Sequence, residues 1–439
     1  MRRKMIRPAA PRPPTPRPSP RPAAVAPPPQ DLELLIERVA PQGEGLAEGP
    51  IYAPITLPGE RIAARVVGER AEVLSLLQAS PDRIEPPCPH FGACGGCALQ
   101  HWAHEPYLAW KVEQIRSVLA RERIETEFAA PFAAPPGTRR RLALHARKRG
   151  GRTILGFKTR RAWDVVEVVE CPISDPRLVA ALPLLAAFAA PLFQHPKSAP
   201  TLHVTWSDDG LDVDVTGVEA KSGGLDADTR VRLADAAVAG RFARATLGGE
   251  IIYQARRPTV RFGVARVAYP PGGFLQAVEA AEQAMVAFAV EATAGADRVA
   301  DLFCGSGAFT FRLAEHASVT ALDSGAPAIA AIREAVAAAP GLKQIDAQAR
   351  DLDRRPLLAM EMKKLDAVVF DPPRAGAVEQ ARQIAESKVA RVVGVSCNPA
   401  TFARDARVLV DAGFVLKRVL PVDQFLWSPH IELVGVFER

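Results

Sequence analysis

Residues 301–310 read DLFCGSGAFT, and they decide the fold of the C-terminal part of the chain. The apolar run RVADLF (298–303) is typical of a buried strand, and AFTFRLAEHA after the turn is typical of a helix. Gly305 and Gly307 let the backbone of this turn approach a ligand closely, and we expect Asp301 at the strand end to face the same crevice. A Gly-x-Gly turn alone is weak evidence, because many strand-to-helix turns contain one.

A second acid strengthens the interpretation of this turn as a cofactor loop. Asp323 closes the next predicted strand, 18 residues after Gly305, where a carboxylate can bind both ribose hydroxyls. Phe309 and Thr310 stand where the dinucleotide fingerprint G-x-G-x-x-G has its third glycine. S-adenosylmethionine therefore fits better than NAD, since it carries no pyrophosphate that needs this glycine. Asp351 falls where a third strand is expected to end, and we expect it near the adenine.

Strands and helices alternate from about residue 275 to the C-terminus. Further strands are predicted at 318–323, 365–370 and 390–396, with the helical segment APAIAAIREAVAAA after the first of these. Helices between strands indicate a parallel, doubly wound sheet, whose ligands bind at the carboxyl ends of the strands. We therefore predict an α/β, Rossmann-like domain over residues 271–439.

The N-terminal half is organised differently. Residues 1–30 hold seven Lys or Arg, eleven Pro and no acid, which predicts a disordered tail. Five short strands are expected in 31–85, as in a small β-barrel of the oligonucleotide-binding type. Residues 86–270 are predicted to form a β-rich central domain.

Composition limits the classes of function. The net charge is +6 in 439 residues, and no stretch reaches the ~18 apolar residues of a membrane span. The N-terminus lacks the apolar core of a signal peptide, so we expect a cytoplasmic protein without membrane contact. Six cysteines in such a chain are too few for a disulfide framework and are expected to be ligands or catalysts.

One stretch is strongly basic. Residues 138–163 hold ten Lys or Arg and no Asp or Glu, with Gly150-Gly151 between two alternating runs. This pattern predicts a β-hairpin with a Gly-Gly turn. Although a solvated face explains some of the charge, a single sign over the whole stretch favours contact with phosphates.

The last strands end in chemically distinctive residues. FDPPRAG (370–376) places Asp371 and two prolines at a strand end, as in base-modifying methyltransferases. In enzymes that methylate amino groups an aromatic residue follows the prolines, whereas this chain has Arg374, which argues against an exocyclic nitrogen as the target. Cys397 in VSCNPATFARD ends the next strand, and Glu432 precedes the final one.

Cys397 and Glu432 together suit methylation of uracil at C5. Because this carbon is a weak nucleophile, a thiolate must first add to C6, and a base must later remove the C5 proton. Cys397, Glu432 and Asp371 supply a nucleophile, a base and a polar contact for the enolate. A free cysteine has a pKa near 8.5, so the site must also favour the thiolate.

Three cysteines lie in CPHFGACGGC (88–97), spaced C-x5-C-x2-C. From the residues alone they are compatible with a disulfide knot, a zinc knuckle, an iron–sulfur site or a nucleophile with neighbours. Zinc knuckles usually show two close C-x2-C pairs, which this stretch lacks.

The motifs CPHFGACGGC, LGF…VVECPI, FLQ, DLFCGSGAFT, DPPRAG, SCNPATFARD and HIE occur in one order over residues 31–439, and the chain thereby resembles the bacterial RNA uracil-C5 methyltransferases. The resemblance is to the iron–sulfur branch that acts on 23S rRNA. It implies an N-terminal TRAM barrel, a central domain that carries the cluster and a C-terminal class I methyltransferase domain. The expected partner is RNA, with 23S rRNA favoured, and we expect a monomer.

The resemblance also implies roles for single residues. Cys397 matches the nucleophile and Glu432 the base. The resemblance assigns contacts with S-adenosylmethionine or the base to Gln276, Phe303, Asp323, Asp351 and Asp371, and it assigns the ligands of a 4Fe-4S cluster to Cys88, Cys94, Cys97 and Cys171. Cys304 in the glycine loop is interpreted as structural.

The chain departs from the family pattern in places. Val278 stands where relatives usually have Asn, Ala308 stands where a relative has Asn, and Asp323 replaces a more common Glu. Three alternatives remain open: a tRNA uridine methyltransferase, a non-catalytic RNA-binding or redox-sensing iron–sulfur protein, and a zinc-dependent RNA-binding module with an unrelated methylation activity.

Overall fold

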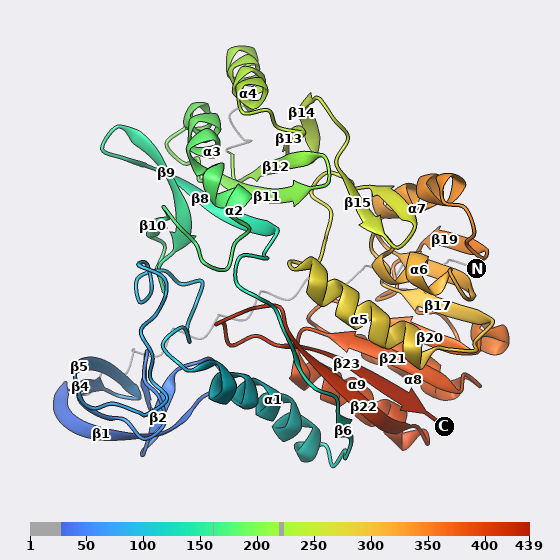
Figure 1. Ribbon diagram of the computed structural model, residues 1–439, viewed down its shortest axis with the longest axis horizontal. Helices are drawn as coiled ribbons and strands as arrows, with labels where there is room; N and C mark the ends of the chain where they lie inside the picture. The colour runs from blue at the N-terminus through green and yellow to red at the C-terminus, as the bar shows by residue number, and fades with distance from the viewer. Residues whose placement is uncertain (1–27, 161, 219–223) are drawn as a thin grey trace, which may run out of the picture.

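The computed structural model describes residues 28–160, 162–218 and 224–439, so almost all of the predicted tail (1–30) lies outside the described residues. Figure 1 shows three parts: a small barrel in blue, a central β-rich part in green, and a larger α/β part in yellow to red. Helix α1 (His104–Arg121) runs from the barrel along the α/β part.

The N-terminal strands form a closed barrel in the order β1-β2-β3-β5-β4. The strands are β1 (Gln30–Val39), β2 (Gly45–Ala47), β3 (Ile51–Ala53), β4 (Arg61–Val67) and β5 (Arg70–Gln78). Small and branched side chains such as Ile36, Ala53 and Ile62 fill its interior. Five short strands followed from the turn signals, and their closure removes the free strand edges.

The central part is built on a seven-stranded sheet in the order β10-β9-β8-β11-β12-β13-β14. Its strands are β8 (Arg141–Arg149), β9 (Arg152–Lys158), β10 (Val165–Glu167), β11 (Thr201–Ser207), β12 (Gly210–Thr216), β13 (Arg244–Leu247) and β14 (Glu250–Gln254). Helices α2 (Pro176–Ala180), α3 (Leu182–Ala189) and α4 (Ala227–Ala239) and the 3-10 turn η1 (Ala190–Leu192) accompany it. The predicted hairpin is β8–β9, and Gly150 and Gly151 take φ of 57° and 80° in its turn, where other residues are disfavoured.

The C-terminal part carries a nine-stranded sheet in the order β19-β18-β17-β20-β21-β23-β22-β6, with β7 also paired to β22. The strands are β6 (Glu127–Phe128), β7 (Phe132–Ala133), β17 (Arg298–Leu302), β18 (Ser318–Asp323), β19 (Ile345–Ala349), β20 (Ala367–Phe370), β21 (Arg391–Ser396), β22 (Val415–Asp423) and β23 (Glu432–Glu438). The helices are α5 (Glu279–Ala292), α6 (Ala308–Leu313), α7 (Ala326–Ala338), α8 (Val378–Glu386) and α9 (Pro399–Asp411), with η2 (Glu361–Lys364) before β20.

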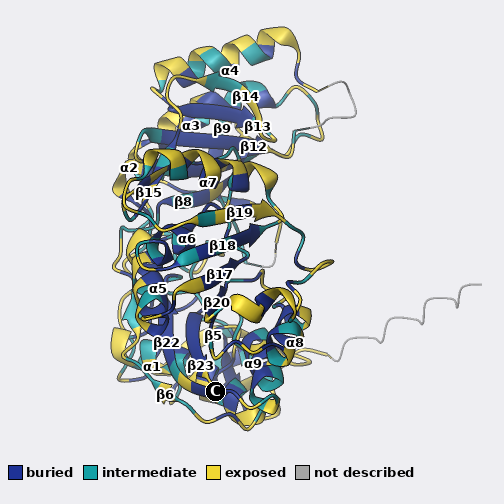
Figure 2. Ribbon diagram, turned by 90° about the vertical axis from the view of Figure 1, so that its right-hand side faces the viewer, coloured by how far each residue is buried: buried dark blue, intermediate teal, exposed yellow. Residues whose placement is uncertain are grey.

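Eight strands of this sheet run in one direction, and β23 lies antiparallel between β21 and β22. The strand order reverses between β17 and β20, so the crevice for a ligand lies at their carboxyl ends. Figure 2 shows β17 and β20 mainly buried and the edge strand β19 largely exposed, with exposed faces on the surrounding helices. The prediction of a Rossmann-like sheet is confirmed.

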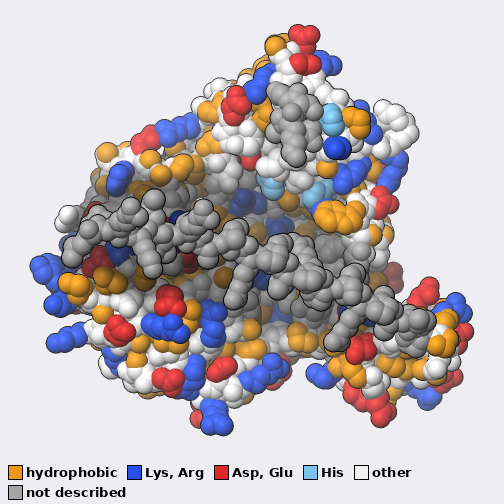
Figure 3. All heavy atoms as spheres, turned by 180° about the vertical axis from the view of Figure 1, so that it is seen from behind, with side chains coloured by type: hydrophobic (Ala, Val, Ile, Leu, Met, Phe, Trp, Pro, Cys, Tyr) orange, Lys and Arg blue, Asp and Glu red, His pale blue; other side chains and the backbone are white. Residues whose placement is uncertain are grey.

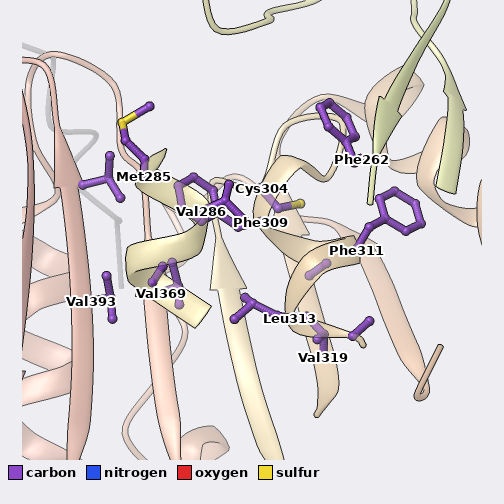
Figure 4. Packing of buried hydrophobic residues seen from close by; sticks show 14 of the residues in the cluster. Phe262, Met285, Val286, Cys304, Phe309, Phe311, Leu313, Val319, Val369 and Val393 are labelled. Carbon is purple, nitrogen blue, oxygen red and sulfur yellow. The ribbon is translucent and has the colours of Figure 1, made fainter. Parts of the chain in front are cut away.

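The core of the C-terminal part also contains side chains from segments that were expected in the central domain. Figure 4 shows Phe262 of the β15–β16 hairpin (Thr259–Phe262, Ala265–Ala268) beside Phe311, and their rings lie 6.5 Å apart. Ile115 and Leu119 of α1 are buried in the cluster that covers the other face of the sheet. The packing therefore departs from the predicted boundaries: residues 104–133 and 259–268 pack with the C-terminal part, because the apolar faces of the sheet need these elements as cover.

Within the described ranges, no helix combines the length and the apolar character needed to cross a membrane. Figure 3 shows Lys and Arg side chains mixed with Asp and Glu over the visible surface of the rear face.

Candidate active site

A cavity of ≈ 480 Å³ opens at the carboxyl ends of the parallel strands. Cys397 follows β21, Asp371 follows β20, and Asp323 ends β18, so three strand ends supply chemically active groups to one space. The predicted site residues that line it are Gln276, Phe303, Asp323, Asp371, Cys397 and Glu432. The structure thus brings together six side chains spread over more than 150 positions of the sequence.

The glycine loop and Asp323 form one unit. The Asp323 carboxylate accepts hydrogen bonds from the backbone N–H groups of Gly305 (3.0 Å) and Gly325 (2.7 Å). Phe303 has a φ of 61°, which is rare for a bulky residue and is held here by the turn. Each carboxylate oxygen keeps a free lone pair, so Asp323 can still accept two hydroxyl groups of a ribose.

Two acids expected near the cofactor do not line this cavity. Asp301 does not face the crevice: it is fully buried, and Thr310 donates a 2.5 Å hydrogen bond to it across the loop. β17 ends at Leu302, one residue after Asp301. Because side chains alternate along a strand, Asp301 points toward Thr310 of α6. The structure also leaves Asp351 out of the cavity lining, and its carboxylate accepts the N–H groups of Asp353 and Arg354 in a turn.

A chain of buried polar side chains runs behind the cavity, and its middle member, Gln424, had no sequence motif to reveal it. Gln424 lies just after β22 and donates hydrogen bonds to Glu432 and to Gln276 (2.7 Å). Gln276 in turn donates to Asp371 (3.3 Å). The chain joins the candidate base to the strand-end acid through two amides.

Burial changes the acidity of these groups. Removal from water, aided by the charge of Asp371, raises the pKa of Glu432 to about 8, while the hydrogen bond from Gln424 opposes this. Burial also raises the pKa of Asp371 to about 7. Burial and the carboxyl groups of Glu432 and Asp371 raise the pKa of the Cys397 thiol, against the effect of the nearby Arg374 guanidinium. The Glu432 carboxyl group therefore titrates at neutral to mildly alkaline pH, the range in which a general base works well.

Arginines from the central part hold the segment that carries Gln276. Arg141 donates to the carbonyl groups of Gly273 (3.1 Å) and Leu275 (2.8 Å), and Arg140 donates through Nε to the carbonyl of Gln276 (3.1 Å). Arg140 also pairs with the buried Glu282 at 2.9 Å.

The basic stretch is therefore divided between internal contacts and the surface. Its first arginines are internal, because the carbonyl groups of 273–276 need donors, and this part of the phosphate-contact prediction is corrected. Lys148 is exposed, and Lys158 lies 4.1 Å from the ring centroid of Trp163, which is 78% exposed. Arg161 lies outside the described residues.

A second cavity of ≈ 260 Å³ adjoins the first, and Cys397 lines both. Its walls come from the barrel (Gln42), from α1 (Gln114, Arg121) and from the loop before β23 (His430). Arg374 also lines both cavities. Cys397 thus lies between a space bordered by the glycine loop and a space bordered by amides and basic groups.

The comparisons with known proteins agree with this geometry. The family model described as tRNA (Uracil-5-)-methyltransferase matches residues 264–439. A Caulobacter vibrioides protein named "Uncharacterized RNA methyltransferase" is 62% identical over 93% of this chain and 100% of its own length. The 23S rRNA (uracil(1939)-C(5))-methyltransferase of Halomonas elongata is 33% identical over 93% of this chain and 89% of its own length.

This chain belongs to the RNA uracil-C5 methyltransferase family. The crystal structure of the Pyrococcus abyssi tRNA (uracil-54, C5)-methyltransferase in complex with S-adenosyl-L-homocysteine superimposes with a TM-score of 0.71, at 23% identity, over 92% of this chain and 99% of that one. The fold of the methyltransferase is thereby shared with a solved structure over nearly its whole length. The interpretation of the chain as an enzyme of this class is confirmed.

The four remaining predicted site residues of this methyltransferase gather around a separate cavity of ≈ 350 Å³: Cys88, Cys94, Cys97 and Cys171. Burial raises the pKa of Cys97 to about 12, and it also raises the pKa values of Cys88 and Cys94, so without a cation these thiols stay protonated. Within the described part of the chain, no group of three or more Cys, His, Asp or Glu side chains is arranged to hold a metal ion. The donor set suits an iron–sulfur cluster, but the sulfurs do not form a closed coordination shell.

The cysteine loop of the methyltransferase, residues 88–99, contacts all three parts of the molecule. Gly95 donates to the carbonyl of Lys158 (2.9 Å) on the basic hairpin, and a Cβ at Gly95 would lie 2.8 Å from that oxygen. Ala98 and Leu99 donate to the carbonyl of Trp427 at 2.8 and 3.0 Å. Trp427 belongs to the turn between β22 and β23, eight residues long, which leads directly to Glu432.

Proposed function

We propose that this enzyme converts a uridine of 23S rRNA to 5-methyluridine with S-adenosylmethionine as the methyl donor. The observation that carries the proposal is the common cavity of Cys397, Glu432 and the glycine loop with Asp323. A 23S rRNA target is supported by the Halomonas relative, which matches along most of its length. The description of the family model favours a tRNA target instead.

The proposed reaction uses the chain's own groups in sequence. The Cys397 thiolate adds to C6 of the uracil, and the C5–C6 double bond becomes an enolate, for which Asp371 is the proposed polar contact. S-adenosylmethionine supplies an electrophilic methyl group, which C5 takes up as S-adenosylhomocysteine leaves. Glu432 then removes the proton from C5, the double bond re-forms, and the Cys397 thiolate departs.

Donor binding is assigned to groups around the glycine loop. Asp323 is proposed to accept the ribose hydroxyls, and Phe303 and Gln276 are proposed to contact the donor or the base. Asp351 closes a turn beyond β19, and its contact with the adenine stays a prediction.

The RNA is proposed to cross the basic hairpin and the second cavity. Lys148 and Lys158 would meet phosphates, Trp163 would stack on a base, and Arg121 and Arg374 would contact the strand beside the target. The target uridine must leave its stack for Cys397 to reach C6.

Cys88, Cys94, Cys97 and Cys171 are proposed to hold a 4Fe-4S cluster with a structural or RNA-positioning role. When bound, the cluster would cross-link the loop 88–97 to the end of the basic hairpin region through iron–thiolate bonds. Three of these cysteines lie on the loop that donates to Trp427 and Lys158, which supports a bracing role. Anaerobically purified Cys171→Ser protein should lose its iron and its brown colour; unchanged iron content would show that the four-ligand assignment is wrong.

Mass spectrometry of RNA from a deletion strain tests the target. Loss of one 5-methyluridine from 23S rRNA is expected, whereas loss from tRNA alone would move the substrate to tRNA. The mechanism is tested by Glu432→Gln, which should accumulate a covalent RNA–protein adduct stable on denaturing gels. Turnover without adduct in that variant, or full activity in Cys397→Ala, would contradict the assigned roles.

A further inference from the structure

The amide of Gln424 has one possible orientation. Its Oε1 accepts the backbone N–H of Val278 at 3.3 Å, and a backbone N–H can only donate. The Nε2 group therefore faces the other way, and its two hydrogens meet Gln276 Oε1 and Glu432 Oε2. A flipped amide would set donor against donor at Val278 and oxygen against oxygen at Glu432.

This orientation passes along the buried chain. Since Gln276 Oε1 accepts from Gln424, the Nε2 of Gln276 must point at Asp371, where it lies 3.3 Å from Oδ2. Gln276 and Gln424 are 6% and 2% exposed, so water has little access to compete for these contacts. A single backbone N–H thus fixes the direction of two side-chain amides.

The two oxygens of Glu432 are consequently not equivalent. Oε2 accepts from Gln424 whether or not the carboxyl group is protonated, so a proton on this acid must sit on Oε1. Oε1 makes no hydrogen bond with any described residue. It is also not fully enclosed by protein atoms in the described part of the chain. Glu432 lines the reaction cavity, so Oε1 is the oxygen left for a substrate proton.

We propose that Gln424 is a positioning residue, which holds Glu432 by Oε2 and thereby reserves Oε1 for the C5 proton of the substrate. The proposal rests on the proposed role of Glu432 as the base. The position of Gln424 follows from the strands: Val422 pairs with Glu432 across β22 and β23, and Gln424 lies two residues beyond Val422, on the same side of the strand.

The groups that face Glu432 determine how loss of Gln424 acts. Asp371 from β20 and the Cys397 thiol from β21 both lie near the carboxyl group, and His430 lies on the same loop. Among the described residues no cation offsets the effect of burial on Glu432, so the hydrogen bond from Gln424 is what lowers the pKa of this carboxyl group. Its removal moves this pKa further upward, and less carboxylate is present at neutral pH.

The test compares Gln424→Met with Gln380→Met in the full-length, iron-loaded enzyme. Gln380 is a matched control, since it is a buried glutamine (1% exposed) that bonds only the backbone of Leu357, away from the cavity. For Gln424→Met we expect kcat at pH 7 to fall about tenfold, corresponding to an upward shift of about one pH unit in the rising limb. Both KM values should stay within about threefold, since donor and RNA contacts are retained.

A second readout is the covalent adduct. In Gln424→Met the adduct should accumulate at pH 7 and resolve at pH 9, whereas in Glu432→Gln it should persist at both pH values. Gln424→Asn, which keeps the amide but shortens its reach, should show the same shift if Gln424→Met does not fold. An equal loss of activity at every pH, a wild-type profile, or the same shift in Gln380→Met would overturn the proposal. Absence of an adduct in Glu432→Gln would instead refute the base assignment.

Discussion

Replacement of Lys111 by Met tests the support beneath the turn that leads to Glu432, the proposed base. Lys111 on α1 and Asp423 at the end of β22 form an ion pair of 2.5 Å in which neither side chain is exposed. Tyr107 donates to the other oxygen of Asp423 (2.6 Å), and Lys111 also donates to the carbonyl of Phe425 (3.0 Å). Lys111→Met removes two of these contacts and leaves a buried carboxylate with one partner.

The expected cost follows from this burial. Loss of one partner of a fully buried ion pair destabilises proteins by about 3–5 kcal/mol, because the remaining charge is neither solvated nor compensated. In a unit of roughly 200 residues each kcal/mol lowers Tm by about 2–4 °C, so a fall of roughly 10 °C is expected for the C-terminal part. Differential scanning calorimetry measures this as a shift of one transition.

Two variants check the reasoning. Lys111→Met with Asp423→Asn removes the charge but keeps an acceptor for Tyr107, and it should recover most of the lost stability. Arg61→Met breaks an exposed pair with Glu33, where the side chains are 56% and 64% exposed, and should change Tm by less than about 4 °C, since such pairs contribute roughly 0–1 kcal/mol. A decrease in Tm of less than 2 °C for Lys111→Met would refute the argument. A double variant as unstable as the single one would refute it as well.

Three further outcomes are expected. Arg141→Ala removes both hydrogen bonds to the segment before Gln276 and should raise the Kd for S-adenosylmethionine about tenfold in calorimetry, with Tm little changed, as about 1.4 kcal/mol is lost. Asp323→Ala should weaken donor binding by about a hundredfold, since a charged acceptor usually contributes about 1.5–3 kcal/mol, whereas Asp323→Glu should retain most of it. The kcat of the wild type should rise with pH through about 8, because Glu432, whose pKa is raised to about 8, must be ionised; a flat profile from pH 6 to 9 would contradict this.

The sequence predicted the strand ends well, since apolar runs that stop at a polar residue define both a strand and its chemistry. Asp323 and Cys397 were located in this way, and the structure places both at the cavity. Five strands and a Gly-Gly hairpin followed from turn residues, whose backbone preferences are local. These features depend on residues that are close together in the sequence, so a single sequence is enough to predict them.

Contacts between segments that are far apart in the sequence could not be predicted in this way. Gln424 reads as an ordinary polar residue after a strand, and its role depends on Gln276, 148 positions away. Lys111 lies on an amphipathic helix, where a lysine is normally solvated, yet it is fully buried against Asp423. Arg140 seemed to belong to a phosphate-binding run, but the carbonyl of Gln276 and the carboxylate of Glu282 take its donors.

The turn between β22 and β23 shows how these long-range contacts converge. Trp427 has a φ of 58°, a conformation that costs about 1–3 kcal/mol for a non-glycine residue and needs outside support. Tyr107 of α1 accepts its N–H (2.7 Å), while the cysteine loop donates to its carbonyl through Ala98 and Leu99. The same turn ends at Glu432. Because the donors to Trp427 follow Cys97 directly, any displacement of the cysteine loop acts on this turn through hydrogen bonds rather than through solvent. The turn that leads to Glu432, the proposed base, is therefore held by elements outside the sheet that presents this residue.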